Sequence, residues 1–422
     1  MQKIVIVILF FGNLCFGQSK YNIDSLKQVS ASIHNPDSAR AKSYVALLRF
    51  YRNNNADSCV TYFEKFLEFS KKQNYDPAFY EYYRLKADYF SFFEESKGDA
   101  YPFINSHLLE ALAYAKKLED PKKVFIIYSR LTQENARLGR ENEALEFARE
   151  AEKVARHHEM WEELAYILGQ IGKVYNLGFR KTDIALEYLL KSDSIYHKIN
   201  FEGYQRGFTL TFIGDVYEVF EDYEKAEKYQ NEALMVFRTA KNQYQQNFIF
   251  GKLALLESKQ GHYEKAKSYI KDAITYYQKN SFPIEESVFL VILSDLYLKS
   301  GDPSSALKTG DEAIAISQSA NDEYGLMKAY VNQSKVYRAN KEYKKSNELA
   351  VQAEALAQKM EFYEELKEIY ELLYLNSENT GSFKEAYHYS NAFRRVNDTL
   401  VSRKNLHNAK ELEAKYQTEK KE

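Results

Sequence analysis

The sequence predicts an all-α protein built from a repeated pair of helices, and three observations lead to this prediction. Residues of small volume recur at a fixed spacing of 40 positions, and only 16 glycines and 6 prolines interrupt the 422 residues. Apolar residues follow the 3–4 spacing of one helical face. Few turn residues indicate long regular elements, and a long fixed period is typical of stacked repeats.

Residues 1–17 are the first element and have the features of a secretory signal peptide. Lys3 provides the positive start, Ile4–Phe11 the apolar run, and Cys15-Phe16-Gly17 a cleavage site. The apolar run is too short to span a bilayer core of about 30 Å, so we expect cleavage near Gly17 and a periplasmic or secreted protein. Lipid attachment at Cys15 is the disfavoured alternative, because Leu14 stands where a lipoprotein signal usually has a small residue.

Residues 18–38 are expected to form a lead-in helix that caps the first repeat, and residues 39–397 to form the repeats themselves. After cleavage Cys59 is the only cysteine, so no intramolecular disulfide can form and packing must supply the stability. We expect Cys59 to be a buried small residue in a second helix of a pair rather than a reactive thiol.

Four columns of residues keep one register over five consecutive units. Two columns lie on the second helix: Ala226, Ala266, Ala306, Ser346 and Ala386, then Ala233, Ala273, Ala313, Ala353 and Phe393. A third lies on the first helix: Gly214, Ala254, Ser294, Ser334 and Tyr374. A fourth is mostly aromatic: Tyr223, Tyr263, Pro303, Tyr343 and Phe383. The third column precedes the first by 12 residues, which predicts that small residues lie where two antiparallel helices approach closely.

Earlier units continue the pattern less regularly. They are marked by Ile104, Leu108 and Ala111, by Leu131, Ala144, Ala148 and Ala151, and by Leu168, Ile171, Gly172, Tyr175 and Ala185. One extra residue is inserted near Gly178. The pattern resembles the tetratricopeptide repeat, most closely over residues 163–360. This resemblance implies a right-handed α-solenoid of about nine helix pairs, whose first helices line a concave groove. The usual unit has 34 residues, so a unit of 40 predicts longer helices.

The predicted groove wall consists of first-helix residues on either side of the small-residue column. The candidates for partner contact are Tyr166, Lys173, Asn176, Phe208, Thr211, Asp215, Phe248, Asp295, Lys335 and Arg338. The Lys and Asn pattern with which tetratricopeptide co-chaperones clamp a terminal carboxylate is absent from these columns. Mixed polarity suits an extended or helical peptide segment. The alternative that stays open is that much of this surface only packs or is solvated.

No motif for catalysis or for cofactor binding occurs in the chain. His157-His158-Glu159 is the nearest approach to a metal site, but adjacent residues of a helix point about 100° apart, which favours a solvated helix end. The 58 basic and 60 acidic residues are dispersed, so no basic stripe indicates nucleic-acid binding. We therefore expect a non-enzymatic module that binds a protein or peptide and holds no cofactor or metal.

Residues 398–422 are expected to form a C-terminal helix that begins a coiled coil, with Ala409, Leu412 and Tyr416 at 3–4 spacing. With Ile23-Asp24-Ser25-Leu26-Lys27, this segment resembles Bacteroidota-type signalling proteins. In these proteins, periplasmic repeats lead into a coiled coil, a membrane helix and a histidine kinase or helix-turn-helix output. The resemblance implies an extracytoplasmic recognition module of a signal-transduction protein. It also makes the C-terminal helix a candidate dimer contact, and we expect membrane contact only if the chain continues beyond Glu422. The alternative is a free-standing periplasmic adaptor that assembles other proteins.

Overall fold

The computed structural model describes residues 22–93 and 100–419, and all regular structure within these ranges is helical. The predicted signal peptide, with Cys15 and Gly17, lies outside the described residues. Within the described ranges, no helix has both the length and the hydropathy needed to cross a bilayer. Packing divides the chain into an N-terminal unit that ends at Phe201 and a C-terminal unit that begins at Glu202.

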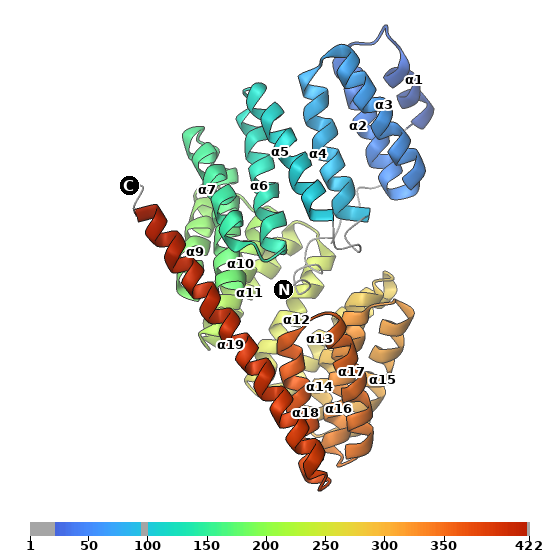
Figure 1. The fold of residues 1–422 in the computed structure, drawn as a ribbon, viewed down its shortest axis with the longest axis vertical. Coiled ribbons are helices and arrows are strands. Elements are labelled where there is room, and N and C mark those ends of the chain that lie inside the picture. Colours follow the sequence, from blue (N-terminus) through green and yellow to red (C-terminus); the bar gives the residue numbers. More distant parts are fainter. Residues whose placement is uncertain (1–21, 94–99, 420–422) are drawn as a thin grey trace. The chain divides into compact units, whose positions relative to one another are not determined.

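The N-terminal unit begins with the short helix α1 (Ile23–Ala31), which packs on α2 and whose start is capped by the side chain of Asn22. Four helix pairs follow. They are α2 (Asp37–Asn54) with α3 (Ala56–Gln73), α4 (Asp76–Phe93) with α5 (Ala100–Lys117), α6 (Pro121–Arg137) with α7 (Glu141–His157), and α8 (Trp161–Lys173) with α9 (Thr182–Lys198). A π-helix, η3 (Val174–Phe179), continues α8. Figure 1 shows α4 to α7 side by side in chain order.

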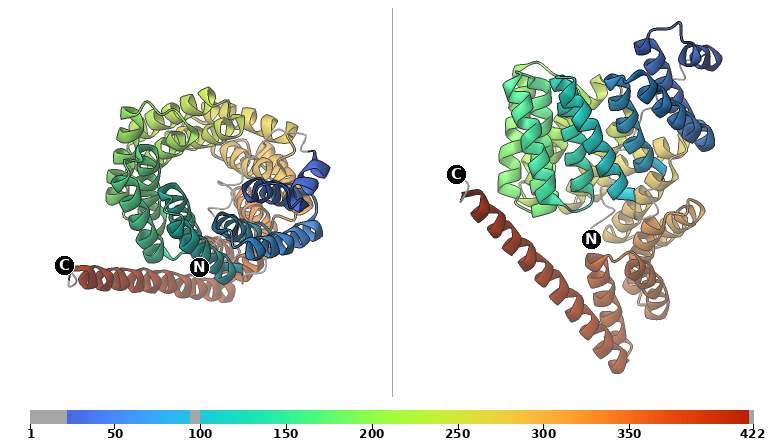
Figure 2. Two further views of the ribbon diagram at one scale, coloured as in Figure 1. Left: turned by 90° about the horizontal axis from the view of Figure 1, so that it is seen from above. Right: turned by 45° about the horizontal axis from the view of Figure 1, so that its top comes forward.

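The C-terminal unit contains five more pairs. They are α10 (Tyr204–Val219) with α11 (Tyr223–Thr239), α12 (Gln243–Lys259) with α13 (Tyr263–Lys279), α14 (Pro283–Lys299) with α15 (Pro303–Ser319), α16 (Glu323–Ala339) with α17 (Tyr343–Lys359), and α18 (Tyr363–Asn379) with α19 (Phe383–Glu419). The 37-residue α19 is much longer than the 17-residue α18 and extends past it as a single helix (Figure 2). Nine pairs within the described ranges confirm the predicted all-α repeat solenoid.

Regular turns explain the 40-residue period. From α11 to α18 every helix has 17 residues, and three residues separate each helix from the next. The central residue of each turn has a positive φ, and these residues recur every 20 positions: Glu221, Lys241, Gly261, Ser281, Gly301, Asn321, Lys341, Glu361 and Gly381. This left-handed residue ends the helix and reverses the chain. Because all the turns are short, the additional residues of each unit lengthen the helices, as predicted.

The small-residue columns lie at the contact between the two helices of a pair. Ala226, Ala266 and Ala306 are fully buried, as are the four alanines of the column that begins at Ala233, whereas Phe393 at its end is half-buried. In the α14–α15 pair the hydroxyl of Ser294 donates to the carbonyl of Ala306 at 2.8 Å. In the next pair the hydroxyls of Ser334 and Ser346 lie 2.9 Å apart. The first- and second-helix columns therefore touch each other, which confirms the predicted register.

The first helix pair packs in a different way, which explains why the repeat pattern fades toward the N-terminus. Its core is aromatic, formed by Tyr44, Phe63, Phe66, Phe69 and Tyr82 together with smaller residues. The rings of Tyr44 and Phe66 stack with centroids 5.1 Å apart. Cys59 is 1% exposed in this core, and burial raises the pKa of its thiol to about 11. Such a thiol is unreactive, as expected for a structural cysteine.

Candidate functional site

Each inner first helix leaves one narrow stripe open to solvent. On α12 this stripe consists of Phe248, Lys252, Leu255 and Lys259, which are half-buried or exposed. Most of the residues between them, such as Leu253, are buried, and Phe250 is half-buried. A helix that packs on its own second helix and on both neighbouring pairs has little surface left, so contact with a partner is confined to residues spaced three and four apart.

The stripe of α12 is tied to that of α10 by two ion pairs. The Lys259 ammonium lies 2.9 Å from the Glu218 carboxylate, and Lys252 lies 3.0 Å from Asp215. The Lys252 ammonium also lies 5.6 Å from the centroid of the Phe248 ring. The structure thus brings the predicted residues Asp215 and Phe248 together through Lys252. Lys252 was not among the predicted contact residues, because it belongs to the column next to those from which they were drawn.

Burial shapes the electrostatics of this contact. Burial raises the pKa of the Asp215 carboxyl above its ordinary value, although the Lys252 ammonium and the side chain of Gln230 both favour the charged form. Burial by itself would lower the pKa of Lys252, but the charge of Asp215, its hydrogen bond and the charge of Glu218 together outweigh burial, so the pKa of this ammonium is raised. The Lys252 and Asp215 side chains are 23% and 20% exposed, so the two form a half-buried ion pair on the open stripe.

A second set of ion pairs joins α16 to α18. Lys335 donates to the Glu368 carboxylate, and Lys328 lies 3.3 Å from Glu365. Arg338, in the last turn of α16, is half-buried. Its Nε atom is buried without a hydrogen-bond partner in the described part of the chain. The open face of α16 therefore carries three cations, Lys328, Lys335 and Arg338.

Two predicted contact residues do not reach an open stripe. Thr211 is 4% exposed, and its hydroxyl donates to the carbonyl of Gly207 in its own helix at 2.9 Å. Its carbonyl accepts a hydrogen bond from Gln230 of α11, so this position faces the second helix. Adjacent residues point about 100° apart, and the half-buried residue is Phe212, one position later. Lys173 is only 7% exposed, and burial lowers the pKa of its ammonium to about 8. The side chains of both residues are therefore buried in the described structure, unlike the other predicted contact residues.

The insertion expected near Gly178 is accommodated by the π-helix η3. Asn176, a predicted contact residue, lies in this helix and is half-buried. Gly178 permits a close approach, because a Cβ atom there would lie 2.3 Å from the Cγ atom of Glu141. About three turns earlier, on α8, the Tyr166 hydroxyl accepts a hydrogen bond from Gln133 of α6, so Tyr166 joins two first helices.

The two remaining predicted residues have intramolecular partners. Phe208 is half-buried, and its ring lies edge-on to Phe237 with centroids 5.4 Å apart. Asp295 forms an ion pair with Lys299, one turn later on α14, at 2.7 Å. Phe208 therefore contributes mainly to packing, whereas Asp295 stays at the surface of its own helix.

The N-terminal unit contains a charged network that the sequence analysis missed. Arg130 of α6 contacts Asp88 of α4 at 3.1 Å and Glu134 of its own helix at 3.2 Å. Arg84 and Arg137 extend the network by pairing with Asp88 and Glu134, respectively. The network joins the first helices α4 and α6, just as the ion pairs of the C-terminal unit join α10 to α12 and α16 to α18. The available signal was the i,i+4 spacing of opposite charges at 84 and 88 and at 130 and 134.

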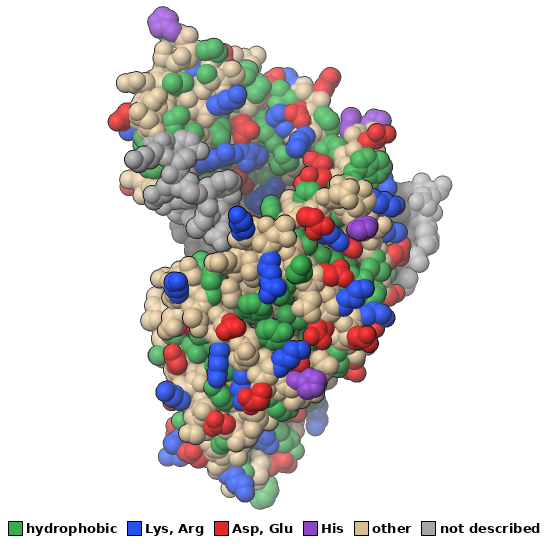
Figure 3. Space-filling model, turned by 180° about the vertical axis from the view of Figure 1, so that it is seen from behind, with side chains coloured by type: hydrophobic (Ala, Val, Ile, Leu, Met, Phe, Trp, Pro, Cys, Tyr) green, Lys and Arg blue, Asp and Glu red, His purple; other side chains and the backbone are tan. Residues whose placement is uncertain are grey.

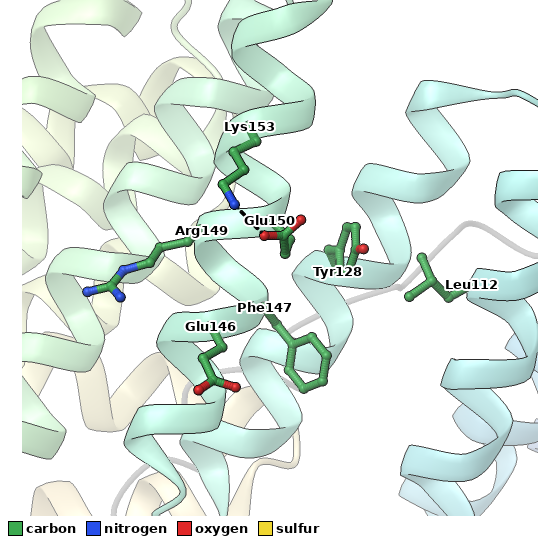
Figure 4. Close-up of a pocket in the computed structure, with 7 residues that line it drawn as sticks. All are labelled: Leu112, Tyr128, Glu146, Phe147, Arg149, Glu150 and Lys153. Carbon is green, nitrogen blue, oxygen red and sulfur yellow. Dashed lines mark hydrogen bonds and ion pairs between the residues drawn. The ribbon is translucent and has the colours of Figure 1, made fainter. Parts of the chain in front are cut away.

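An open pocket of about 420 Å³ lies between the second helices α5 and α7, above α6. Leu112, Tyr128 and Phe147 form its apolar side, and the rings of Tyr128 and Phe147 are 6.4 Å apart. Figure 4 shows Lys153 directed toward Glu150, to which it is bonded at 2.6 Å, and Arg149 pointing away from the aromatic pair. The pocket is an apolar recess with charges of both signs at its rim.

The described residues contain no group of three metal-ligating side chains. The rings of His157 and His158 pack edge to face, 4.7 Å apart, at the end of α7. Figure 3 shows Lys and Arg interspersed with Asp and Glu over the face displayed. What the geometry provides is a set of open helical stripes whose charges are mostly paired between neighbouring repeats.

Comparison with known protein families identifies the repeat. A family model described as the tetratricopeptide repeat matches residues 249–280, which run from α12 through α13. The fold is that of a tetratricopeptide-type α-solenoid. No curated protein sequence matches this repeat solenoid.

Solved structures show the same fold at low sequence identity. A Rap protein complexed with Competence and Sporulation Factor has a TM-score of 0.55 and 16% identity, covering 87% of this chain and 99% of that one. Aspartyl phosphate phosphatase F from Bacillus subtilis has a TM-score of 0.56 and 18% identity, covering 80% and 88%. A signal-transduction ATPase with a tetratricopeptide repeat sensor, from Pyrococcus horikoshii, has a TM-score of 0.53 and 19% identity, covering 80% and 52%. At these identities the likeness concerns the fold alone.

Proposed function

We propose that this solenoid is a non-enzymatic module that binds a peptide or protein segment along the open stripes of its first helices. We further propose that it acts outside the cytoplasm as the recognition part of a signal-transduction protein. The first statement rests on the open stripe of α12. The second rests on the signal-peptide pattern of residues 1–17 and on the resemblance of residues 398–422 to the coiled-coil junction of signalling proteins.

The stripe of α12 combines accessible apolar side chains with charges fixed in place. Leu255 is 38% exposed and Phe248 is half-buried, so both retain surface that a partner can cover. Between and beside them, Lys252 and Lys259 are held by carboxylates of α10. Side chains that are already ordered lose little conformational entropy on binding, so such a wall favours recognition of a segment with apolar anchors.

Two structures of the same fold serve as precedents. One was solved with Competence and Sporulation Factor bound to a Rap protein, and the other contains a tetratricopeptide repeat sensor in a signal-transduction ATPase. Both support the proposal that this solenoid recognises a partner and reports its presence.

Peptide display tests the binding proposal directly. The full chain is used to select from a random peptide library, and selected peptides are titrated by fluorescence anisotropy. We expect Leu255→Asp, and the double change Lys335→Glu and Arg338→Glu, to weaken selected peptides at least about tenfold, roughly 1.4 kcal/mol. The matched control is Lys228→Glu on the second helix α11, where the side chain is 66% exposed. Peptides that are indifferent to both first-helix changes would contradict the proposal.

Mass spectrometry of the expressed protein tests the compartment. If residues 1–17 direct export, the periplasmic fraction contains a chain that starts at Gln18. A chain that retains Met1 and stays with the cytoplasmic fraction would refute export without affecting the binding proposal.

A further inference from the structure

The ion pairs that join neighbouring first helices of the C-terminal unit share one orientation. They are Lys252 with Asp215, Lys259 with Glu218, Lys328 with Glu365, and Lys335 with Glu368. The helix α14 lies between α12 and α16, because Tyr244 of α12 donates to Glu285 of α14 at 2.6 Å and Asn332 of α16 donates to Ser294 of α14 at 2.7 Å. In each pair the cation therefore belongs to a helix next to α14, and the carboxylate belongs to the helix beyond it.

The cation is also the more exposed member of each pair. The side chain of Lys259 is 48% exposed and that of Glu218 is 20% exposed. Lys328 and Glu365 are 36% and 14% exposed. The remaining two pairs differ less, but in the same direction. A partner that lies over α14 therefore meets more lysine surface than carboxylate surface on both sides.

Between these cations, the open stripe of α14 begins with apolar residues. Val288 and Ile292 pack against the buried core and are themselves half-buried, so part of each side chain stays accessible. Leu255 of α12 is 38% exposed. Farther along α14, Asp295 is paired with Lys299 at 2.7 Å, and the lysine is again the more exposed side chain, at 48% against 33%. The open stripes of α12, α14 and α16, here called the central face, thus combine an apolar middle with cations on both sides.

The spacing of the lysines on the central face matches a helical partner. Lys252 and Lys259 are seven residues apart on α12, as are Lys328 and Lys335 on α16, and seven residues of a helix span about 10 Å. By the 40-residue period, Lys328 and Lys335 correspond to positions 248 and 255 of α12. The cations therefore alternate between the two sides of α14 at intervals of four, three and four residues. A helix along α14 presents side chains on its two flanks at the same intervals, whereas an extended chain that crosses the helices meets the cations at one level only.

We propose that the central face binds an acidic amphipathic helix of a partner protein, which lies along α14. Its apolar side covers Val288, Ile292 and Leu255, and its glutamate or aspartate residues lie beside the lysines of α12 and α16. Helices in contact lie about 8–10 Å apart, so α12 and α16 are separated by roughly 20 Å, which admits a helix about 10–12 Å wide. The proposal rests on the binding function proposed above, and it adds the charge, the conformation and the direction of the bound segment.

Three synthetic peptides of 17 residues, the length of α14, test the partner's chemistry by fluorescence anisotropy with the full chain. The first has leucine on one helical face and glutamate on both flanks. The second has the same residues in an order without an apolar face, and the third has lysine in place of each glutamate. We expect the first peptide to bind at least about tenfold more tightly than the others, to become helical by circular dichroism, and to weaken as salt is raised from about 0.05 M to 0.5 M.

Either of two results with these peptides overturns the proposal. Equal binding of the second peptide indicates an extended acidic segment, because that peptide keeps the charge but has no apolar face. Equal binding of the third peptide shows that the lysines of the central face do not select the charge of the partner.

Charge reversal tests the location of the site. The double change Lys259→Glu and Lys335→Glu removes one cation from each side of α14 and should weaken the first peptide at least about tenfold. The matched control is Lys228→Glu with Lys345→Glu, because both lysines lie in ion pairs on second helices and are 66% and 57% exposed. Circular dichroism confirms that both variants are folded. Equal weakening by the two double changes, or no weakening by either, overturns the proposal.

Failure of this proposal is distinguishable from failure of the binding function. If peptides selected from the random library bind and respond to Leu255→Asp, but the acidic amphipathic peptide does not bind, the open stripes take another class of segment and only this proposal fails. If neither the selected peptides nor the designed peptide bind, both proposals fail.

Discussion

Replacing Ala266 with leucine tests the packing between the helices of a pair. Ala266 is fully buried on α13, and its first-helix counterpart Ala254 is fully buried on α12. In the equivalent positions of the next pair, the hydroxyl of Ser294 already contacts the carbonyl of Ala306 at 2.8 Å. There is no room for three more carbon atoms, so the two helices must separate or distort.

The expected loss follows from this geometry. Overpacking a close-packed core typically costs about 1–3 kcal/mol, whereas the helix propensity of leucine is nearly that of alanine. We therefore expect Ala266→Leu to lower the free energy of unfolding by about 2–3 kcal/mol. With a urea dependence of about 2 kcal/mol per molar, the unfolding midpoint falls by roughly 1 M. Asp272→Leu adds similar bulk at an exposed position of α13 and should shift the midpoint little.

Urea unfolding followed by circular dichroism measures the midpoint, and fluorescence of Trp161, the single tryptophan, reports the N-terminal unit separately. In a solenoid each repeat contacts only its neighbours, so Ala266→Leu should affect the dichroism more than the fluorescence. If Ala266→Leu and Asp272→Leu have the same midpoint as the parent chain, the assigned register is incorrect.

Three further predictions concern individual side chains. Lys252→Met leaves the Asp215 carboxylate buried without its cation, so the free energy of unfolding should fall by about 3 kcal/mol at neutral pH. Burial raises the pKa of Asp215 in the folded protein, so protonation of this carboxyl stabilises the fold. The unfolding free energy lost through Lys252→Met should therefore become smaller as the pH falls toward the ordinary carboxyl pKa and larger as the pH rises. Urea midpoints at several pH values measure this change. Gly172→Ala should destabilise by about 1–2 kcal/mol in the same assay, because a Cβ atom there lies 2.7 Å from Leu189 Cγ and 3.0 Å from the Ala185 carbonyl. Gly178→Ala should destabilise less than Gly172→Ala, because the three atoms nearest to its Cβ all belong to the Glu141 side chain and none to the backbone, and equal effects of the two glycine changes would contradict this reasoning. Burial lowers the pKa of Lys173 from 10.5 to about 8, so the unfolded chain binds its proton more tightly. Stability relative to Lys173→Met should therefore rise with pH across that interval, and an NMR titration of Lys173 with a midpoint near 10.5 would refute the assignment.

The fold was predictable because its main determinant is a periodic restriction on residue size. Positions such as Ala226 and Ala306 must be small wherever two helices cross closely, and that requirement repeats with each pair. The same residues are those whose burial the structure confirms. Where aromatic residues replace this restriction, as around Phe66, the pattern in the sequence is weaker although the helix pair is the same.

The open stripes were predictable only to within one residue. Thr211 was predicted to line the groove wall, but a single step along the helix, about 100°, separates it from the half-buried Phe212. Periodicity indicates which residues share a face of a helix. It does not say how much of that face the neighbouring second helix covers. The missed residue Lys252 belongs to the adjacent column for the same reason.

Contacts between repeats were the least predictable part of the site. The pairing of Arg130 with Asp88 joins residues 42 positions apart in a region where the spacing is irregular. The π-helix η3 similarly shifts the positions around Asn176 relative to the other repeats. Such contacts depend on how far one helix is shifted along another. This shift can be inferred from a single sequence only where the repeat spacing is regular.

A disulfide between the two small-residue columns tests the central claim most directly. The hydroxyls of Ser334 and Ser346 lie 2.9 Å apart in a fully buried contact, so cysteines at both positions are close enough to bond. We predict that the double change Ser334→Cys and Ser346→Cys, refolded under mild oxidation, gives an intramolecular disulfide detectable by peptide mapping, and that neither single change does. If both cysteines remain free thiols in the folded protein, the columns do not meet and the nesting of helix pairs is not as described.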